Sequence, residues 1–232
     1  MKFALLSDIH SNFYAIEAVL LAVKKRNIQK LIITGDFVGY YFWPQETLNL
    51  LDGWDVTAIA GNHDRMLKKA IHDAEYKSEV SKKYGSGLNV AIDELDGGKI
   101  KWLMDMPDSL KLQTKHGCIL LCHGSPWDVD EYIYPDLDEI SLVRYSNLNV
   151  KWVVQGHTHY SMKQKVGAVT IINPGSVGQP RNRRPGAQWA LLDTKLNKID
   201  FFCEQYDMKI VIEESKKRHP DIPYLANILE RT

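Results

Sequence analysis

The chain has 232 residues, and its 29 lysines and arginines balance its 29 aspartates and glutamates. A formal net charge of zero argues against a protein that coats long nucleic acid, because such proteins carry a basic surface. Charged residues at 25% and hydrophobic residues at 44% are ordinary for a globular protein and exclude a disordered chain. The apolar stretches are much shorter than the about 20 residues that cross a bilayer.

The predicted location is the cytoplasm. The N-terminus lacks the long apolar region and the cleavage site of a signal peptide. The three cysteines, Cys118, Cys122 and Cys203, form no CxxC pair, so no disulfide framework is expected and a reducing compartment fits.

The first quarter of the chain alternates short apolar runs with helical patterns. We expect strands at 2–7, 31–34 and 56–60 and helices at 12–25 and 44–51. This strand–helix order predicts a buried parallel sheet with right-handed connections.

The rest of the chain predicts a helical insertion followed by hairpins. Residues 65–106 are polar and helical, with breaks near Gly85 and Gly97. The later predicted elements are hairpins at 110–122, 162–172 and 187–204, a strand at 152–155, and helices at 136–145 and after 207. We therefore expect one domain over residues 1–232, of the α/β class, with two packed sheets and helices outside.

Polar side chains of the metal-ligand type follow five of the expected strands. They are Asp8 and His10, Asp36, Asn62 and His63, His123, and His157 and His159. In open α/β sheets, ligands bind where strands end and loops begin, so these side chains are expected to converge. Each residue alone has an ordinary structural explanation, such as a helix cap, a turn or a structural histidine. Together, such a buried polar cluster would be costly to desolvate without a metal.

The motifs "SDIHSN", "TGDFVGY", "AGNHD", "CHGSP" and "GHTH" occur in this order between residues 7 and 159. This set resembles the calcineurin-like metallophosphoesterase family, and the following "NPGSVGQPR" resembles its small single-domain prokaryotic branch. The resemblance implies a four-layer α/β/β/α sandwich of two mixed sheets.

The resemblance also implies two divalent metal ions, with Mn favoured and Fe, Zn, Co or Ni also compatible with nitrogen and oxygen ligands. The first metal would be held by Asp8, His10, Asp36 and His159, and the second by Asp36, Asn62, His123 and His157. Asp36 would bridge the two ions, and hydroxide generated between them would attack phosphorus in line.

His63 is expected to face the substrate phosphate, either as the general acid for the leaving oxygen or as a donor to a phosphoryl oxygen. Larger phosphatases of the family carry an acidic residue three positions after the bridging aspartate, and it orients this histidine. Gly39 stands there in this chain, and Asp64 is an acidic residue directly after His63 in sequence.

Four further residues are candidate substrate contacts. Asn12 follows the first ligand pair, and helix capping is an equally good explanation for it. Tyr40 and Trp43 belong to an aromatic loop that either stacks on a nucleobase or packs as a hydrophobic lid. Arg181 carries a planar guanidinium that suits a polyphosphate, although a solvated loop explains it as well.

The expected function is hydrolysis of phosphodiester or phosphoanhydride bonds in a small phosphorylated substrate, possibly a nucleotide or a dinucleoside polyphosphate. A phosphoprotein or small-molecule phosphomonoesterase is the alternative within the enzymes. A non-catalytic metal-binding scaffold that docks partner proteins is the alternative of another class, and a nuclease is disfavoured by the zero net charge. A homodimer is possible, and no membrane or long nucleic acid is expected as a partner.

Overall fold

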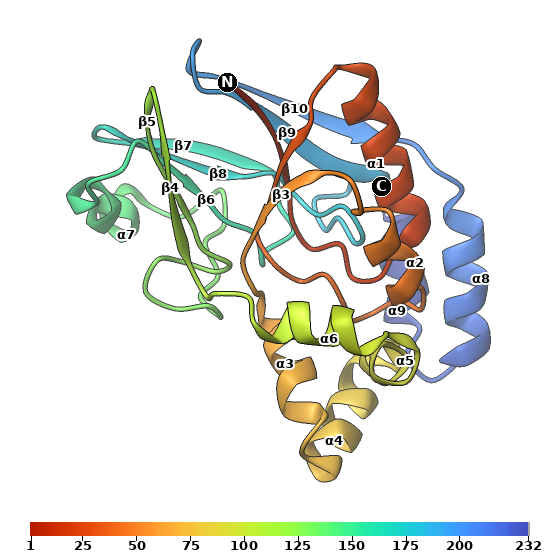
Figure 1. Ribbon diagram of the computed structural model, residues 1–232. Coiled ribbons are helices and arrows are strands. Elements are labelled where there is room, and N and C mark those ends of the chain that lie inside the picture. The colour runs from red at the N-terminus through yellow and green to blue at the C-terminus, as the bar shows by residue number, and fades with distance from the viewer. Residues whose placement is uncertain (232) are drawn as a thin grey trace.

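The computed structural model describes residues 1–231 and contains two five-stranded mixed sheets (Figure 1). Sheet A has the order β10-β9-β1-β2-β3. Its strands are β1 (Lys2–Leu6), β2 (Lys30–Ile33), β3 (Asp55–Ala58), β9 (Ala187–Asp193) and β10 (Lys198–Glu204). The first three run parallel to one another, and β9 and β10 complete the sheet as an antiparallel hairpin. The predicted parallel start of the fold is therefore confirmed.

Sheet B has the order β4-β5-β6-β8-β7. Its strands are β4 (Leu110–Thr114), β5 (Gly117–Leu121), β6 (Trp152–Val154), β7 (Met162–Val166) and β8 (Val169–Asn173). The central strands β5, β6 and β8 are parallel, and β4 and β7 are antiparallel edges. Each sheet thus has three parallel strands whose carboxyl ends can present loops to a common site.

Helices join and cover these strands. In the N-terminal half they are α1 (Phe13–Lys25), α2 (Pro44–Asn49), α3 (Asn62–Ala70), α4 (Ala74–Tyr84), α5 (Gly87–Glu94) and α6 (Gly97–Met104). In the C-terminal half they are α7 (Glu139–Leu142), α8 (Met208–Arg218) and α9 (Tyr224–Asn227). The series α3–α6 connects the two sheets and corresponds to the helical segment expected at 65–106.

The alternation of strand side chains explains the layers. In β1, Leu5 points into a core between the two sheets, where it meets residues such as Trp152 and Ile172 of sheet B. Its neighbours Ala4 and Leu6 point to the other face and pack with α1. The outer face of sheet B packs against the segment around α7. Helices, sheet A, sheet B and α7 therefore form four layers, which confirms the expected fold class (Figure 1).

The prediction of a helix over 136–145 is wrong about where the helix begins. Asp138 caps α7 by accepting a hydrogen bond from the Ser141 N–H at 2.6 Å, so the helix begins at Glu139. A 3₁₀ turn over Val143–Asn147 follows it. Residues 126–138 form an irregular loop beside the polar cluster. Among residues 1–231, no helix has the length and apolar character needed to cross a bilayer.

Candidate metal centre

The seven residues expected to bind metal come together from both sheets. Sheet A contributes four of them after its parallel strands: Asp8 and His10 after β1, Asp36 after β2 and Asn62 after β3. Sheet B contributes three: His123 after β5, and His157 and His159 after β6. Six of the seven are buried, and Asn62 is partly buried.

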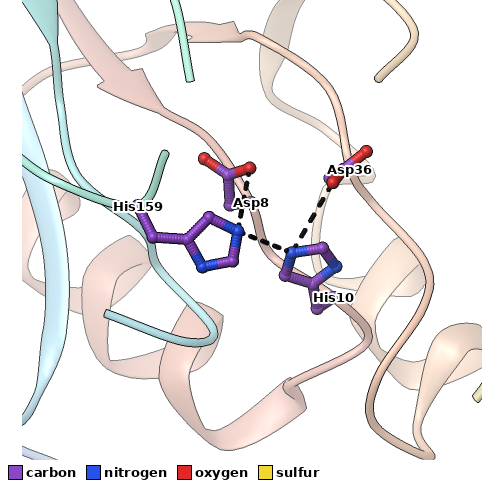
Figure 2. Close-up of side chains that lie close together, drawn as sticks. All are labelled: Asp8, His10, Asp36 and His159. Atoms are coloured by element: carbon purple, nitrogen blue, oxygen red, sulfur yellow. Dashed lines mark hydrogen bonds and ion pairs between the residues drawn. The ribbon is translucent and has the colours of Figure 1, made fainter. Parts of the chain in front are cut away.

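Asp8, His10, Asp36 and His159 form the first group (Figure 2). Each offers one ligand atom, and these four atoms lie within 4.8 Å of one another. His10 Nε2 is 3.2 Å from His159 Nε2 and 3.6 Å from Asp36 Oδ2. His159 Nε2 is 3.4 Å from Asp8 Oδ1. Two imidazole nitrogens and two carboxylates therefore face a common point.

Asp36, Asn62, His123 and His157 form a second group that shares Asp36 with the first. His123 Nε2 lies 2.9 Å from Asn62 Oδ1 and 3.4 Å from Asp36 Oδ2. His157 Nδ1 lies 3.2 Å from the same amide oxygen of Asn62. Asp36 Oδ2 thus faces a histidine of each group.

Backbone carbonyls fix the tautomers of the four histidines. A carbonyl oxygen only accepts, so each ring nitrogen that contacts one must carry its proton. The donor–acceptor pairs are His10 Nδ1 to Val38 O (3.2 Å), His123 Nδ1 to Thr34 O (2.7 Å), His157 Nε2 to Asp130 O (3.2 Å) and His159 Nδ1 to Gln179 O (2.6 Å). The opposite nitrogen of His10, His123 and His159 faces a carboxylate. That of His157 faces the amide oxygen of Asn62. In metal sites, an outer hydrogen bond of this kind orients the ligand.

The inward-facing atoms fit divalent cations. In the neutral rings of His10 and His159, unprotonated nitrogens face each other, which is repulsive unless a cation lies between them. Asp8 Oδ2 is buried and has no hydrogen-bond partner among the described residues. A buried polar atom of this kind is costly unless something binds it. The donor set contains nitrogen and oxygen and no thiolate, which suits first-row divalent metals.

The ionisation of these groups follows from burial and from their mutual charges. Burial lowers the pKa of His10 well below its usual range, against the attraction of Asp36. Burial opposes the charge on Asp36, but His123 and other histidines hold the pKa of that carboxyl well below its usual range. Burial also opposes protonation of His123, but Asp36 raises its pKa to about 10. The centre therefore keeps its carboxylates ionised and draws positive charge toward Asp36.

The ligands sit on an unusual backbone. Nine non-glycine residues of the described chain have positive φ, and five of them are predicted ligands. The five are Asp8 (54°), His10 (50°), Asp36 (58°), His157 (66°) and His159 (62°). This left-handed conformation costs on the order of 1–3 kcal/mol for such residues, and it concentrates at functional sites.

The segment after β8 braces the first loop. The Ser176 hydroxyl and the Gly178 N–H both donate to the carbonyl of Asp8, at 2.8 and 2.9 Å. A Cβ at Gly178 would lie 2.0 Å from the Ile9 carbonyl oxygen, so only glycine allows this approach. The motif "NPGSVGQPR" thus holds Asp8 in place and supplies the Gln179 carbonyl for His159.

The family is decided by a sequence comparison. Residues 1–197 match the model of the calcineurin-like phosphoesterase superfamily domain. The chain belongs to this superfamily. It is 31% identical, over 94% of its length and 93% of the relative's, to the uncharacterized protein MJ0912 of Methanocaldococcus jannaschii.

Solved structures agree with this calcineurin-like phosphoesterase fold. The hypothetical protein PH1004 of Pyrococcus horikoshii OT3 superimposes with a TM-score of 0.87 at 25% identity, covering 98% of this chain and 97% of the other. A metallophosphoesterase from Sphaerobacter thermophilus superimposes with a TM-score of 0.78 at 21% identity, covering 100% of this chain and 98% of the other.

In this member of the superfamily, His63 lies beside the first ligand group. Its ring centroid is 4.9 Å from that of His10 and 4.8 Å from that of Tyr40. Its Nδ1 is buried without a hydrogen-bond partner in the described part of the chain, and burial lowers its pKa to about 4. A Cβ at Gly39 (φ +125°) would lie 2.6 Å from this nitrogen, so the histidine ring fills the space that a side chain at position 39 would need.

Asp64 does not orient His63. Its carboxylate accepts hydrogen bonds from the backbone N–H groups of Asp36 (2.8 Å), Phe37 (3.0 Å) and Gly61 (2.9 Å). It therefore clamps the loop that carries Asp36 onto the start of α3. The adjacency of Asp64 to His63 in sequence gave no indication of this role.

A small cavity of about 40 Å³ opens onto the metal centre. Its lining consists of Asp36, Tyr40, Asn62, His63, Tyr84, Tyr132, His157, His159 and Arg181. Arg181 donates from Nη2 to the Tyr40 hydroxyl and to Gln179 Oε1, both at 3.1 Å. Its buried Nε has no partner among residues 1–231. Two of the four candidate substrate contacts, Tyr40 and Arg181, are thus brought to the centre.

The other two candidate contacts lie outside this lining. Asn12 caps α1 by accepting from the Ala15 N–H and donates to the Gly178 carbonyl and the Tyr206 hydroxyl. Trp43 packs edge-on against Tyr14, with ring centroids 5.1 Å apart. Tyr84 and Tyr132 line the cavity but were not predicted from the sequence. Tyr84 lies at the end of α4, and Tyr132 lies in the 126–138 loop.

Proposed function

We propose that this protein is a dinuclear metal-dependent hydrolase that cleaves phosphodiester or phosphoanhydride bonds of small nucleotides. The observation that carries this proposal is the position of Asp36 Oδ2, 3.6 Å from His10 Nε2 and 3.4 Å from His123 Nε2. One carboxylate oxygen that faces both ligand groups is suited to bridge two cations. Mn²⁺ is the favoured ion. When bound, the ions would activate the attacking water and neutralise charge on the phosphoryl oxygens.

Residues of the chain supply the remaining functions. The Arg181 guanidinium is positioned to bind a phosphoryl oxygen, because it lines the cavity and its buried Nε has no hydrogen-bond partner within residues 1–231. His63 faces the same cavity, where it either protonates the leaving oxygen or donates to a phosphoryl oxygen. Tyr40 holds Arg181 through its hydroxyl.

The shape of the cavity favours a small substrate. A volume of about 40 Å³ beside the ligands admits little more than a phosphoryl group, and three tyrosines surround it. A formal net charge of zero also gives no overall attraction for a long polyanion. We therefore place diesters and anhydrides of small molecules ahead of phosphoproteins and nucleic acids.

The test compares bis-p-nitrophenyl phosphate with p-nitrophenyl phosphate after chelation and re-addition of Mn²⁺. We expect metal-restored cleavage with a preference for the diester. A preference for the monoester would make phosphomonoesterase the function. Bound metal without cleavage of either ester would contradict the proposed hydrolase and favour the scaffold.

The bridging role of Asp36 is tested by elemental analysis of the Asp36→Asn variant. Because this carboxylate belongs to both ligand groups, the variant should lose both ions, whereas Asp93→Asn should retain them. Asp93 is a suitable control because its side chain is 70% exposed and its one ion pair within residues 1–231 is with Lys77, at 3.8 Å. Full metal occupancy in the Asp36→Asn variant would overturn the bridge.

A further inference from the structure

Three tyrosines form an aromatic surface that leads away from the metal centre. They are Tyr132, Tyr134 and Tyr160, named here the tyrosine wall. Tyr132 packs against the predicted ligand His157, with ring centroids 4.2 Å apart. Tyr134 stacks on Tyr132 at 5.7 Å and 15°, and Tyr160 meets Tyr134 edge-on at 5.5 Å and 84°.

The loop that carries the first two tyrosines is held at two points. The Asp130 carbonyl accepts the hydrogen bond from His157 Nε2, which ties the loop to the metal centre. Further along, Gln164 of β7 donates from Nε2 to the Pro135 carbonyl at 2.7 Å. Tyr132 and Tyr134 lie between these points and are still 48% and 37% exposed. Exposed rings on a fixed loop are preorganised for a ligand.

A cavity of about 430 Å³ lies against the outer part of the wall. It is lined by Tyr134, Pro135, Asp136 and Tyr160. The flat rings suit an aromatic ligand, because base–aromatic stacking needs only a π-face. The Asp136 carboxylate disfavours phosphate in this cavity and can accept hydrogen bonds from the N–H groups of a base. Arg181 and the imidazoles favour phosphate on the inner side of Tyr132.

We propose that the tyrosine wall is a nucleobase subsite, and that it makes the substrate a nucleotide with its phosphoryl group at the metal centre. This inference rests on the proposed hydrolase function. The proposed site of base recognition is therefore the 126–138 loop, and not the aromatic loop at residues 40–43 that the sequence suggested. Tyr41 and Phe42 of that run are buried with residues of α8 and α9 and cannot offer a free ring face.

The experiment measures the binding of two ligands to the Mn²⁺-loaded protein by calorimetry. The ligands are the phosphonate analogues of AMP and of ribose 5-phosphate, whose C–P bonds cannot be hydrolysed. The AMP analogue should bind about tenfold more tightly or better, the gain expected for stacking of one base. Equal affinities in the wild-type protein would overturn the subsite.

Two variants separate stacking from a general effect on the site. Tyr134→Ala should remove most of the advantage of the AMP analogue and leave the ribose analogue unchanged, whereas Tyr134→Phe should keep it. Leu196→Ala is the control, because Leu196 is 68% exposed in the turn between β9 and β10 and lines neither cavity beside the wall. An equal loss for both ligands in Tyr134→Ala would contradict base recognition.

The segment that follows the 126–138 loop also carries exposed apolar residues, including Ile140 at 84% exposure and Val143 at 57%. Sedimentation of the same variants therefore accompanies the binding experiment. A change of oligomeric state in Tyr134→Ala with unchanged discrimination would assign the wall to an interface between copies and overturn the subsite.

Failure of the hydrolase and failure of the subsite give different results. If wild-type protein cleaves bis-p-nitrophenyl phosphate with metal but binds both analogues equally, the hydrolase stands and the subsite is wrong. If it prefers the AMP analogue but cleaves no ester, the base subsite is supported and the catalytic proposal is wrong.

Discussion

At the scale of single residues, the histidines of the centre differ in what holds them. Those assigned to metal each donate one ring proton to a backbone carbonyl, as His10 does to Val38 and His159 does to Gln179. His63 has no such partner on Nδ1 within residues 1–231, and aromatic rings surround it instead. This difference separates a fixed ligand from a group that is available to the substrate.

His63→Ala should therefore keep the bound metal and lose activity. The ring supplies no atom to either ligand group, so elemental analysis should find wild-type metal content. Turnover of bis-p-nitrophenyl phosphate should fall by on the order of 10²-fold, the contribution of a positioned proton donor.

The control for this variant is His116→Ala, which changes a histidine in the turn between β4 and β5. It should leave both metal content and turnover unchanged. An unaltered rate in His63→Ala would remove this residue from the chemistry, and lost metal would make it a structural part of the centre.

The metal-ligand candidates could be predicted from sequence because their motifs are local. "SDIH" and "GHTH" each place two ligands two residues apart, and a strand end precedes each motif. The substrate side is harder because it depends on which loops meet in space. Tyr84 and Tyr132 are far apart in sequence and share the cavity only after the fold has formed, whereas the more conspicuous Trp43 packs on Tyr14.

At the scale of elements, Asp64 couples the start of α3 to the loop after β2. Its two oxygens accept N–H bonds from Asp36 and Phe37 on one side and Gly61 on the other. Because the Asp36 N–H is among these donors, the position of the Asp36 carboxylate depends on a residue outside both ligand groups.

Asp64→Asn should destabilise the protein and weaken metal binding together. An amide keeps one acceptor oxygen and places an NH₂ group against backbone donors, which leaves buried N–H groups unpaired. We expect a loss of about 1–3 kcal/mol in the free energy of unfolding of the metal-free protein. Denaturant titration measures this loss, and metal titration measures the weaker binding.

A surface carboxylate provides the comparison for Asp64. Asp93→Asn removes an exposed pairing with Lys77 and should change stability by less than about 1 kcal/mol. If Asp64→Asn were as stable as Asp93→Asn, the clamp would contribute nothing and the Asp36 loop would be held by other contacts.

The elements themselves could largely be predicted from sequence because apolar alternation and turn residues mark them. Trp152–Val154 is a buried run followed by a glycine-containing turn, and it forms β6. The start of α7 could not be predicted this way. The apolar spacing around Leu137 and Ile140 resembles that of a helix. However, the Asp138 side chain accepts a hydrogen bond from the Ser141 N–H and caps the N-terminus of α7, so the residues before Asp138 remain a loop.

At the scale of the whole molecule, the candidate metal centre spans both sheets. Asp8 and His10 follow β1 of sheet A, whereas His123 and His159 follow strands of sheet B. The core between the sheets, with Leu5 and Trp152 among its residues, fixes the distance between these two sets. Packing of the sheets and assembly of the centre are therefore one event, and metal binding should stabilise the entire fold.

Removal of metal should consequently lower the thermal midpoint. A ligand that binds only the folded protein adds about 2.7 kcal/mol when its free concentration is 100 times its dissociation constant. For a chain of this length each kcal/mol corresponds to about 2–4 °C, so the shift on chelation should be roughly 5–10 °C. Calorimetry over a series of Mn²⁺ concentrations measures it.

The same experiment on two variants shows which residues hold the metal. The midpoint should rise with Mn²⁺ in wild-type protein and in Asp93→Asn. The rise should be largely lost in Asp36→Asn, because only that variant lacks the carboxylate that joins the two ligand groups. If the thermal midpoint of the wild-type protein did not change with Mn²⁺ concentration, the buried carboxylates and imidazoles would be satisfied without metal. That result would contradict the proposed metal centre.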